Sequence, residues 1–122
     1  MAKKILIVDD SASVRTVARM ALNEAGYEII EAGNGQEALQ KLSGERVHLI
    51  VSDVNMPIMD GITFLKEVKA HPKYKFTPVI MLTTEAGQDK KEAGRAAGAK
   101  AWITKPFQPR NLLDAVAKLI LA

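Results

Sequence analysis

The sequence predicts an α/β fold in which helices cover both faces of a parallel sheet. Strand-like and helix-like patterns alternate along the whole chain, as they do in proteins built from βαβ units. The strand-like runs are short, apolar and rich in β-branched residues, which is typical of buried strands. A chain of 122 residues, 48% of them hydrophobic, has room for one core and not for two. We therefore expect a single doubly wound domain over residues 1–122, with five strands and five helices.

The first half of the chain contains two of these strand and helix pairs. In order, we expect a strand, a helix, a strand and a helix at residues 4–8, 11–26, 27–31 and 34–44. Ser11 or Ser13 can cap the first helix, its apolar residues follow the spacing of one buried face, and Gly26 is suited to end it. The mixed polarity of the second strand is typical of a sheet edge. Asn34 and Gly35 are suited to open the second helix.

The second half of the chain continues the alternation. We expect strands at 49–52, 78–82 and 101–104, and helices at 62–70, at 87–97 and from Pro109 onward. Pro109 suits the first position of a helix because its missing N–H would have no partner there. Gly94 lies in the middle of the fourth helix, where glycine costs about 1 kcal/mol relative to alanine. That helix should be the least firmly held.

Composition excludes several classes of site and partner. The chain has no cysteine, and His48 and His71 lack the spacing of a zinc site, so any metal should be hard and oxygen-bound. The apolar run from Ile5 to Val8 is too short for a signal peptide or a membrane span, so we expect a cytoplasmic protein with no membrane partner. The net charge of +3 comes from scattered residues without a recognition motif, so we expect no nucleic-acid partner.

Polar residues stand where the expected strands end. Asp9 and Asp10 follow the first strand, Asp53 the third, Thr83 the fourth and Lys105 the fifth. Right-handed crossovers bring the carboxyl ends of parallel strands to one edge of the sheet, so these side chains should face a single crevice. Each alone would be an ordinary turn, cap or surface residue. Their occurrence on four strand ends favours a functional site.

Three neighbouring carboxylates repel one another, and Mg²⁺ is the cation that suits a few oxygen ligands and several waters. A lysine and a threonine hydroxyl beside that cation suit a phosphoryl group, whose oxygens need positive charge and hydrogen-bond donors. The sequence therefore predicts a magnesium site in which Asp53 is placed to be the nucleophile.

These residues resemble those of a known family. From end to end the chain is similar to the receiver domain of two-component response regulators, and particularly to the stand-alone chemotaxis regulators. The matching features are Asp9-Asp10, Asp53 with Met56-Pro57, Asp60-Gly61, Thr83 and Lys105-Pro106-Phe107. The resemblance implies a flavodoxin-like fold with strand order 2-1-3-4-5, no effector domain and a cis peptide bond before Pro106.

The resemblance also implies a phosphoryl switch that is not a conventional enzyme. A histidine kinase donates the phosphoryl group to Asp53, and the domain catalyses both this transfer and its own dephosphorylation. Asp10, Asp53 and the backbone carbonyl of Asn55 bind Mg²⁺, or Mn²⁺ in its place, with Asp9 helping directly or through water. Lys105 contacts the phosphoryl oxygens, and Thr83 swings toward them. Thr83 and Trp102 form the switch.

The residues around this core of the site differ in places from the usual receiver pattern. Receivers usually carry tyrosine or phenylalanine where this chain has Trp102, and alanine or glycine where it has Thr84. Asn55 and Glu85 match the chemotaxis prototype, which implies a short-lived phosphoryl state. The output should be binding of a monomer to a downstream protein, such as a flagellar motor switch or a relay component. A role as phosphorelay intermediate or as a sink that regulates a kinase is the alternative.

Two further interpretations of the sequence compete with this one. Residues 33–38 fit the G-x-G-x-x-A pattern of dinucleotide-binding modules, although they follow the second strand and the chain lacks a second mononucleotide-binding half. The site could also belong to a small magnesium-dependent phosphohydrolase with an aspartyl phosphate. Such enzymes carry a second aspartate two residues after the nucleophile, and this chain has Asn55 there, which cannot deliver a proton.

Overall fold

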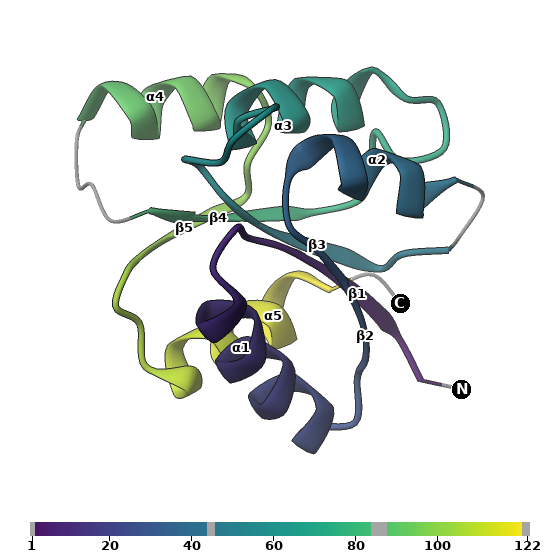
Figure 1. The fold of residues 1–122 in the computed structure, drawn as a ribbon, viewed down its shortest axis with the longest axis vertical. Helices are drawn as coiled ribbons and strands as arrows, with labels where there is room; N and C mark the ends of the chain where they lie inside the picture. Colours follow the sequence, from purple (N-terminus) through teal and green to yellow (C-terminus); the bar gives the residue numbers. More distant parts are fainter. Residues whose placement is uncertain (1, 44–45, 84–87, 121–122) are drawn as a thin grey trace.

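The chain folds as the doubly wound sheet that its sequence predicts (Figure 1). The computed structural model describes residues 2–43, 46–83 and 88–120, without the side chains of 88–91. The five strands are β1 (Lys4–Val8), β2 (Glu28–Ala32), β3 (Leu49–Asp53), β4 (Val79–Thr83) and β5 (Ala101–Thr104). The five helices are α1 (Ala12–Glu24), α2 (Gly35–Leu42), α3 (Gly61–Ala70), α4 (Gln88–Ala96) and α5 (Pro109–Leu119). All strand pairs are parallel, and the order is β2-β1-β3-β4-β5, with the mixed-polarity strand at the edge as expected.

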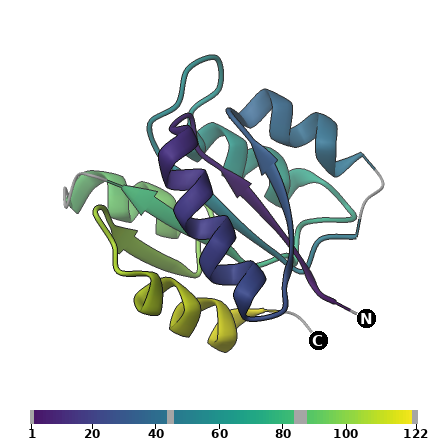
Figure 2. The same ribbon diagram turned by 60° about the horizontal axis from the view of Figure 1, so that its bottom comes forward.

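Helices cover both faces of the sheet. Figure 1 shows α2, α3 and α4 above the strands and α1 and α5 below them, and the turned view in Figure 2 shows α1 and α5 side by side. Successive side chains of a strand point to opposite faces, so each strand contributes to two cores. In β1, Leu6 and Val8 pack toward α2 and α3, whereas Ile5 and Ile7 pack toward α1 and α5. Every residue of β3 and β4 is buried, which explains their nearly continuous apolar sequence.

The helices begin at the caps that the sequence offers. Ser11 caps α1 by accepting a hydrogen bond from the Val14 N–H at 3.3 Å, and Gly26 follows that helix with a φ of 97°. Asn34 caps α2 in the same way, with 2.9 Å between its side-chain oxygen and the Glu37 nitrogen. Pro109 is the first residue of α5. Gly44, the predicted end of the second helix, lies outside the described residues.

Strands β3 and β4 each end one residue later than the sequence predicts. Strand β3 includes Asp53 and strand β4 includes Thr83, where the apolar runs suggested ends at the preceding residues. The backbone ladder continues past the apolar side chains, because Asp53 pairs with Leu82 and Thr83 with Thr104. Both polar residues are therefore held by strand geometry instead of by a loop. The second strand and the helices differ from expectation by one or two residues at some ends, which is within the usual fraying of such elements.

The described part of the chain contains no helix that is long and apolar enough to cross a membrane.

Candidate functional site

The predicted site residues come together at the carboxyl ends of the strands. Asp9 directly follows β1 and is fully buried, while Asp53 at the end of β3 is 4% exposed. Asp10 is exposed beside them. One carboxylate oxygen from each of these three residues lies within 4.8 Å of the other two. The prediction that the strand order would gather these acids at one crevice is confirmed.

Lys105 forms ion pairs with two of the three carboxylates. Its Nζ lies 2.9 Å from Asp9 Oδ2 and 3.2 Å from Asp53 Oδ1, and its side chain is only 12% exposed. The Lys105 N–H donates a hydrogen bond of 2.7 Å to the carbonyl oxygen of Thr83, so the end of β4 fixes where this lysine leaves β5. The bond from Lys105 to Pro106 is cis, as the resemblance implied.

The backbone around Asp9 holds its carboxylate in one orientation. Asp9 Oδ1 accepts a hydrogen bond of 2.9 Å from the Ser11 N–H, and Arg15 Nη1 donates one of 2.6 Å to the Asp9 carbonyl. Arg15 is in turn placed by an ion pair with Glu31, at 3.2 Å. Sequence reasoning missed Arg15, because nothing distinguishes it from other charged residues on the exposed side of a helix.

The second oxygen of Asp9 is the best evidence for a cation site. Asp9 Oδ2 is buried and has no aligned hydrogen-bond donor among the residues that the structure describes, although Lys105 Nζ is near enough for an ion pair. A buried acceptor without a donor is costly, and a bound cation removes that cost. The other nearby ligand atoms are carboxylate oxygens of Asp10 and Asp53, which are the hard donors that Mg²⁺ takes and that Mn²⁺ accepts. The residues present therefore fit the predicted ion.

The charges of the site act on one another. Burial raises the pKa of the Asp53 carboxyl above 3.8, and the negative charge of Asp9 raises it further, while Lys105 opposes both effects. Burial by itself lowers the pKa of Lys105, but the adjacent Asp9 and Asp53 outweigh burial and raise it above 10.5. Without a metal, Lys105 is thus a firmly charged group that partly compensates two crowded acids.

The loop after β3 depends on a glycine. The Gly61 N–H donates a hydrogen bond of 2.8 Å to the carbonyl oxygen of Val54, and a Cβ at position 61 would lie only 2.0 Å from the carbonyl oxygen of Asp53. Asp60 caps α3, accepting a hydrogen bond of 2.8 Å from the Thr63 N–H. Gly61 thus lets the start of α3 approach the backbone of Asp53 closely. The Asp60-Gly61 motif marked this position, but the sequence alone did not reveal the contact.

The remaining predicted residues lie at or near this edge. Thr83 ends β4 and is fully buried, and Asn55 is exposed in the loop just beyond Asp53. Trp102 lies on β5 opposite Met81 and packs against the core beneath α2 and α3. Thr84 and Glu85 lie outside the described residues. The structure thus brings the three acids and Lys105 into direct proximity and leaves Trp102 at the neighbouring strand edge.

Sequence and structure comparisons agree with this geometry. The family model of the response regulator receiver domain matches residues 5–117. The chemotaxis protein CheY1 of Helicobacter pylori strain J99 is 39% identical over 91% of each chain. The structure of the chemotaxis response regulator CheY4 of Vibrio cholerae superimposes with a TM-score of 0.92 at 46% identity, covering 98% of this chain and 99% of that one.

A longer relative is similar as well. The alkaline phosphatase synthesis transcriptional regulatory protein PhoP of Bacillus subtilis is 42% identical over 99% of this chain, which spans about half (49%) of PhoP. The family match therefore covers most of the chain, and its relatives include both chemotaxis proteins and a transcriptional regulator. Together with the gathered carboxylates and lysine, these matches show that the chain belongs to the family of response regulator receiver domains.

Proposed function

We propose that the protein is a phosphoryl-accepting switch in which Asp53 is the acceptor, a histidine kinase is the donor and the output is binding to a downstream protein. The observation that carries this proposal is the contact of Lys105 Nζ with both Asp53 and Asp9, at 3.2 and 2.9 Å, in a cluster of three acids. One carboxylate in this cluster can accept a phosphoryl group while the others hold a cation. Membership of the receiver family supports the general role of a phosphorylatable signalling domain.

The transfer step uses the residues at the strand ends. An oxygen of the Asp53 carboxylate attacks the phosphorus of a phosphohistidine, a P–O bond forms, and the P–N bond breaks. The electron pair of that bond stays on the imidazole nitrogen, so the donor leaves as neutral histidine once proton balance with solvent is restored. The product on this chain is an acyl phosphate, and attack of water on its phosphorus later regenerates the carboxylate and releases inorganic phosphate.

The other residues of the site stabilise charge during this step. Asp9, Asp10 and Asp53 would hold Mg²⁺ together with the backbone carbonyl of Asn55, and when bound the ion neutralises charge on the transferring phosphoryl oxygens. Lys105 can turn from the Asp53 carboxylate to a phosphoryl oxygen, because its Nζ already lies 3.2 Å from Asp53 Oδ1. The Thr83 hydroxyl, at the end of the adjacent strand, is the proposed hydrogen-bond donor to a further oxygen.

The raised pKa of Asp53 is consistent with an acceptor role. Burial and the charge of Asp9 disfavour a second bare anion in the site, and this makes binding of a cation favourable. The residues that would hold the cation are therefore expected to be needed for uptake of the phosphoryl group.

We further propose that the pathway is chemotaxis, in which the phosphorylated protein binds a component such as a flagellar motor switch. The support is similarity to CheY1 and CheY4 over nearly the whole of their length. A relay role, in which the group moves on to another histidine, is the second candidate. Its support is similarity to the receiver domain of a signal transduction histidine kinase from Syntrophus aciditrophicus, which is 37% identical. Transfer from the phosphorylated protein to a histidine phosphotransfer domain would distinguish the relay from the chemotaxis role.

The two rival functions have less support. The Asn34 side chain in the G-x-G-x-x-A segment is engaged in capping α2, where its oxygen accepts from the Glu37 N–H at 2.9 Å. A structural cap accounts for that segment without a dinucleotide. The phosphohydrolase function lacks its general acid, because the position two residues after Asp53 is Asn55.

The experiment that tests the proposal is phosphotransfer from a purified histidine kinase phosphorylated on its histidine. The wild-type protein should take up the phosphoryl group with Mg²⁺ and not with EDTA, and Asp53→Asn should take up none. Asp60→Asn is the matched control, because Asp60 is an exposed cap of α3 and asparagine caps equally well. Uptake by Asp53→Asn equal to that of Asp60→Asn would refute the assignment of Asp53.

A further inference from the structure

The indole of Trp102 occupies a notch that exists because residue 94 has no side chain. A Cβ built on Gly94 would lie 2.2 Å from Cζ3 of Trp102, 3.0 Å from Cε3 and 3.1 Å from Cη2. All three atoms belong to the six-membered ring, so this ring lies directly over the backbone of α4. Gly94 is itself buried, and its φ lies outside the left-handed range in which glycine has an advantage. The glycine is therefore explained by packing and not by backbone conformation.

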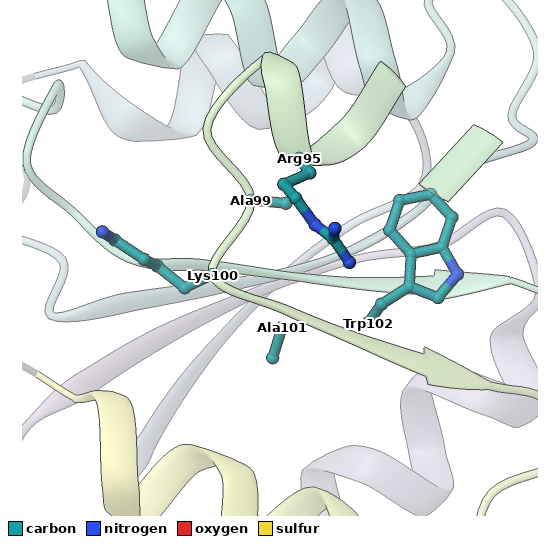
Figure 3. Close-up of a pocket in the computed structure, with 5 residues that line it drawn as sticks. All are labelled: Arg95, Ala99, Lys100, Ala101 and Trp102. Carbon is teal, nitrogen blue, oxygen red and sulfur yellow. The ribbon is translucent and has the colours of Figure 1, made fainter. Parts of the chain in front are cut away.

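The surroundings of Trp102 show that its ring is packed into the protein and does not simply lie on the surface. Trp102 packs against the core beneath α2 and α3. Its indole Nε1 is buried and has no hydrogen-bond partner in the described part of the chain. Burying an indole N–H without an acceptor costs free energy, so the contacts of the ring must outweigh that cost. Figure 3 shows the indole beside Arg95, the residue that follows Gly94. Both side chains line a cavity of about 100 Å³ together with Ala99, Lys100 and Ala101.

The same ring lies on the face of the sheet to which Thr83 points. In the β4–β5 register Met81 faces Trp102 and Thr83 faces Thr104. Because side chains alternate along strands, Trp102 and Thr83 point to the same face, which is the face that α4 covers. Trp102 is thus in position to contact α4 on one side and to lie near the end of β4 on the other.

We propose that Gly94 is the positioning residue for Trp102: its missing side chain seats the indole against α4, and only through this contact can the switch role already expected of Trp102 act on α4. The transmission rests on the proposed function, whereas the seating does not. Glycine in the middle of a helix lowers its stability relative to alanine. Here that loss accompanies a notch that accepts the indole of Trp102.

A thermodynamic cycle tests the seating. Gly94→Ala adds a methyl group that clashes with the indole but improves helix propensity, so the two effects have opposite signs. In the wild-type background we expect the midpoint of urea unfolding to fall. In the Trp102→Ala background, where the clash is absent, the same change should raise the midpoint. A change of the same sign in both backgrounds would overturn the proposal.

Fluorescence gives a second measurement that does not depend on how stable the Trp102→Ala protein is. Trp102 is the sole tryptophan, so the emission of the protein reports on the surroundings of this ring. In Gly94→Ala the displaced ring should emit at longer wavelength and be quenched more by acrylamide than in the wild type. An unchanged emission maximum together with unchanged quenching would refute the seating.

Transmission is tested by adding Mg²⁺ and beryllofluoride, which mimics the acyl phosphate. Calorimetry should show the same Mg²⁺ affinity in the wild type and in Gly94→Ala, because Gly94 is not among the ligands. The emission change produced by beryllofluoride in the wild type should be lost in Gly94→Ala. Binding with an emission change of equal size in both proteins would overturn the transmission, whereas absence of Mg²⁺ and beryllofluoride binding to the wild type would count against the proposed function itself.

Discussion

Replacing Gly61 by alanine should disturb both the fold and the acceptor site. The added Cβ would lie 2.0 Å from the Asp53 carbonyl oxygen and 2.8 Å from Val54 Cα, where ordinary contact begins at 3.4 Å. Both atoms belong to the backbone, so no side-chain rotation relieves the clash. The start of α3 must move away from β3 by more than 1 Å, a shift that also strains the hydrogen bond from the Gly61 N–H to Val54.

The magnitude follows from these two losses. Overpacking of this kind costs about 1–3 kcal/mol, and loss of one hydrogen bond adds about 1 kcal/mol. The higher helix propensity of alanine returns at most about 1 kcal/mol. We therefore expect Gly61→Ala to lower the free energy of unfolding by about 1–3 kcal/mol, which for small domains corresponds to a fall in Tm of roughly 2 °C or more per kcal/mol. Mg²⁺ affinity should fall as well, because Asp53 moves.

The assay is urea unfolding followed by far-ultraviolet circular dichroism, with Mg²⁺ titration by calorimetry. Gly33→Ala is the matched control, because a Cβ there would have its nearest neighbours at 3.7 and 4.0 Å, which are ordinary contacts. The control should keep its unfolding midpoint and its Mg²⁺ affinity. If Gly61→Ala unfolds at the same urea concentration as Gly33→Ala and binds Mg²⁺ equally well, the argument from close backbone approach is wrong.

Three further changes test other parts of the structure. The pKa of Asp53 is raised in the folded protein, so the folded state keeps a proton at pH values where the unfolded state has already lost it. The free energy of unfolding of the Mg²⁺-free protein therefore falls as pH rises from 3.8 through the folded pKa of Asp53. Asp53→Asn should therefore gain stability over the wild type with rising pH in urea titrations containing EDTA, and a constant difference would contradict this. Ile58 has a φ of 70° and is 76% exposed, so Ile58→Asn should stabilise the fold by up to about 1 kcal/mol in urea unfolding, whereas a lower midpoint would show that the isoleucine has an unrecognised contact. Tyr74 is buried and donates a hydrogen bond to the Leu42 carbonyl, so Tyr74→Phe should cost about 1–3 kcal/mol, and an unchanged midpoint would exclude a stabilising role for that bond.

The sequence predicts the architecture well because its signals are local and repeated. Alternating patterns placed all ten elements, and the caps Ser11 and Asn34 and the first residue of α5, Pro109, were visible as residue types. The gathering of Asp9 and Asp53 followed from topology alone, since parallel strands with right-handed crossovers place their carboxyl ends at one edge. No distance was needed for that prediction.

Contacts between distant segments could not be predicted in the same way. The rotamer that carries Lys105 Nζ to both Asp9 and Asp53 depends on how the strands pack. The close approach at Gly61 and the notch at Gly94 depend on distances between elements. Gly94 is instructive, because propensity alone suggested a weak helix, whereas the structure shows a tryptophan packed on it. A β-branched residue with positive φ, such as Ile58, contradicts local preference and carries no signal in the sequence.

The most direct test of the central claim is to locate the phosphoryl group on the chain. The protein is incubated with Mg²⁺ and the phosphorylated kinase, reduced with borohydride, which converts an aspartyl phosphate to homoserine, and digested for peptide mass mapping. We predict conversion at Asp53 alone, and none when EDTA replaces Mg²⁺. Conversion at Asp9, Asp10 or another residue while Asp53 remains intact would contradict the account.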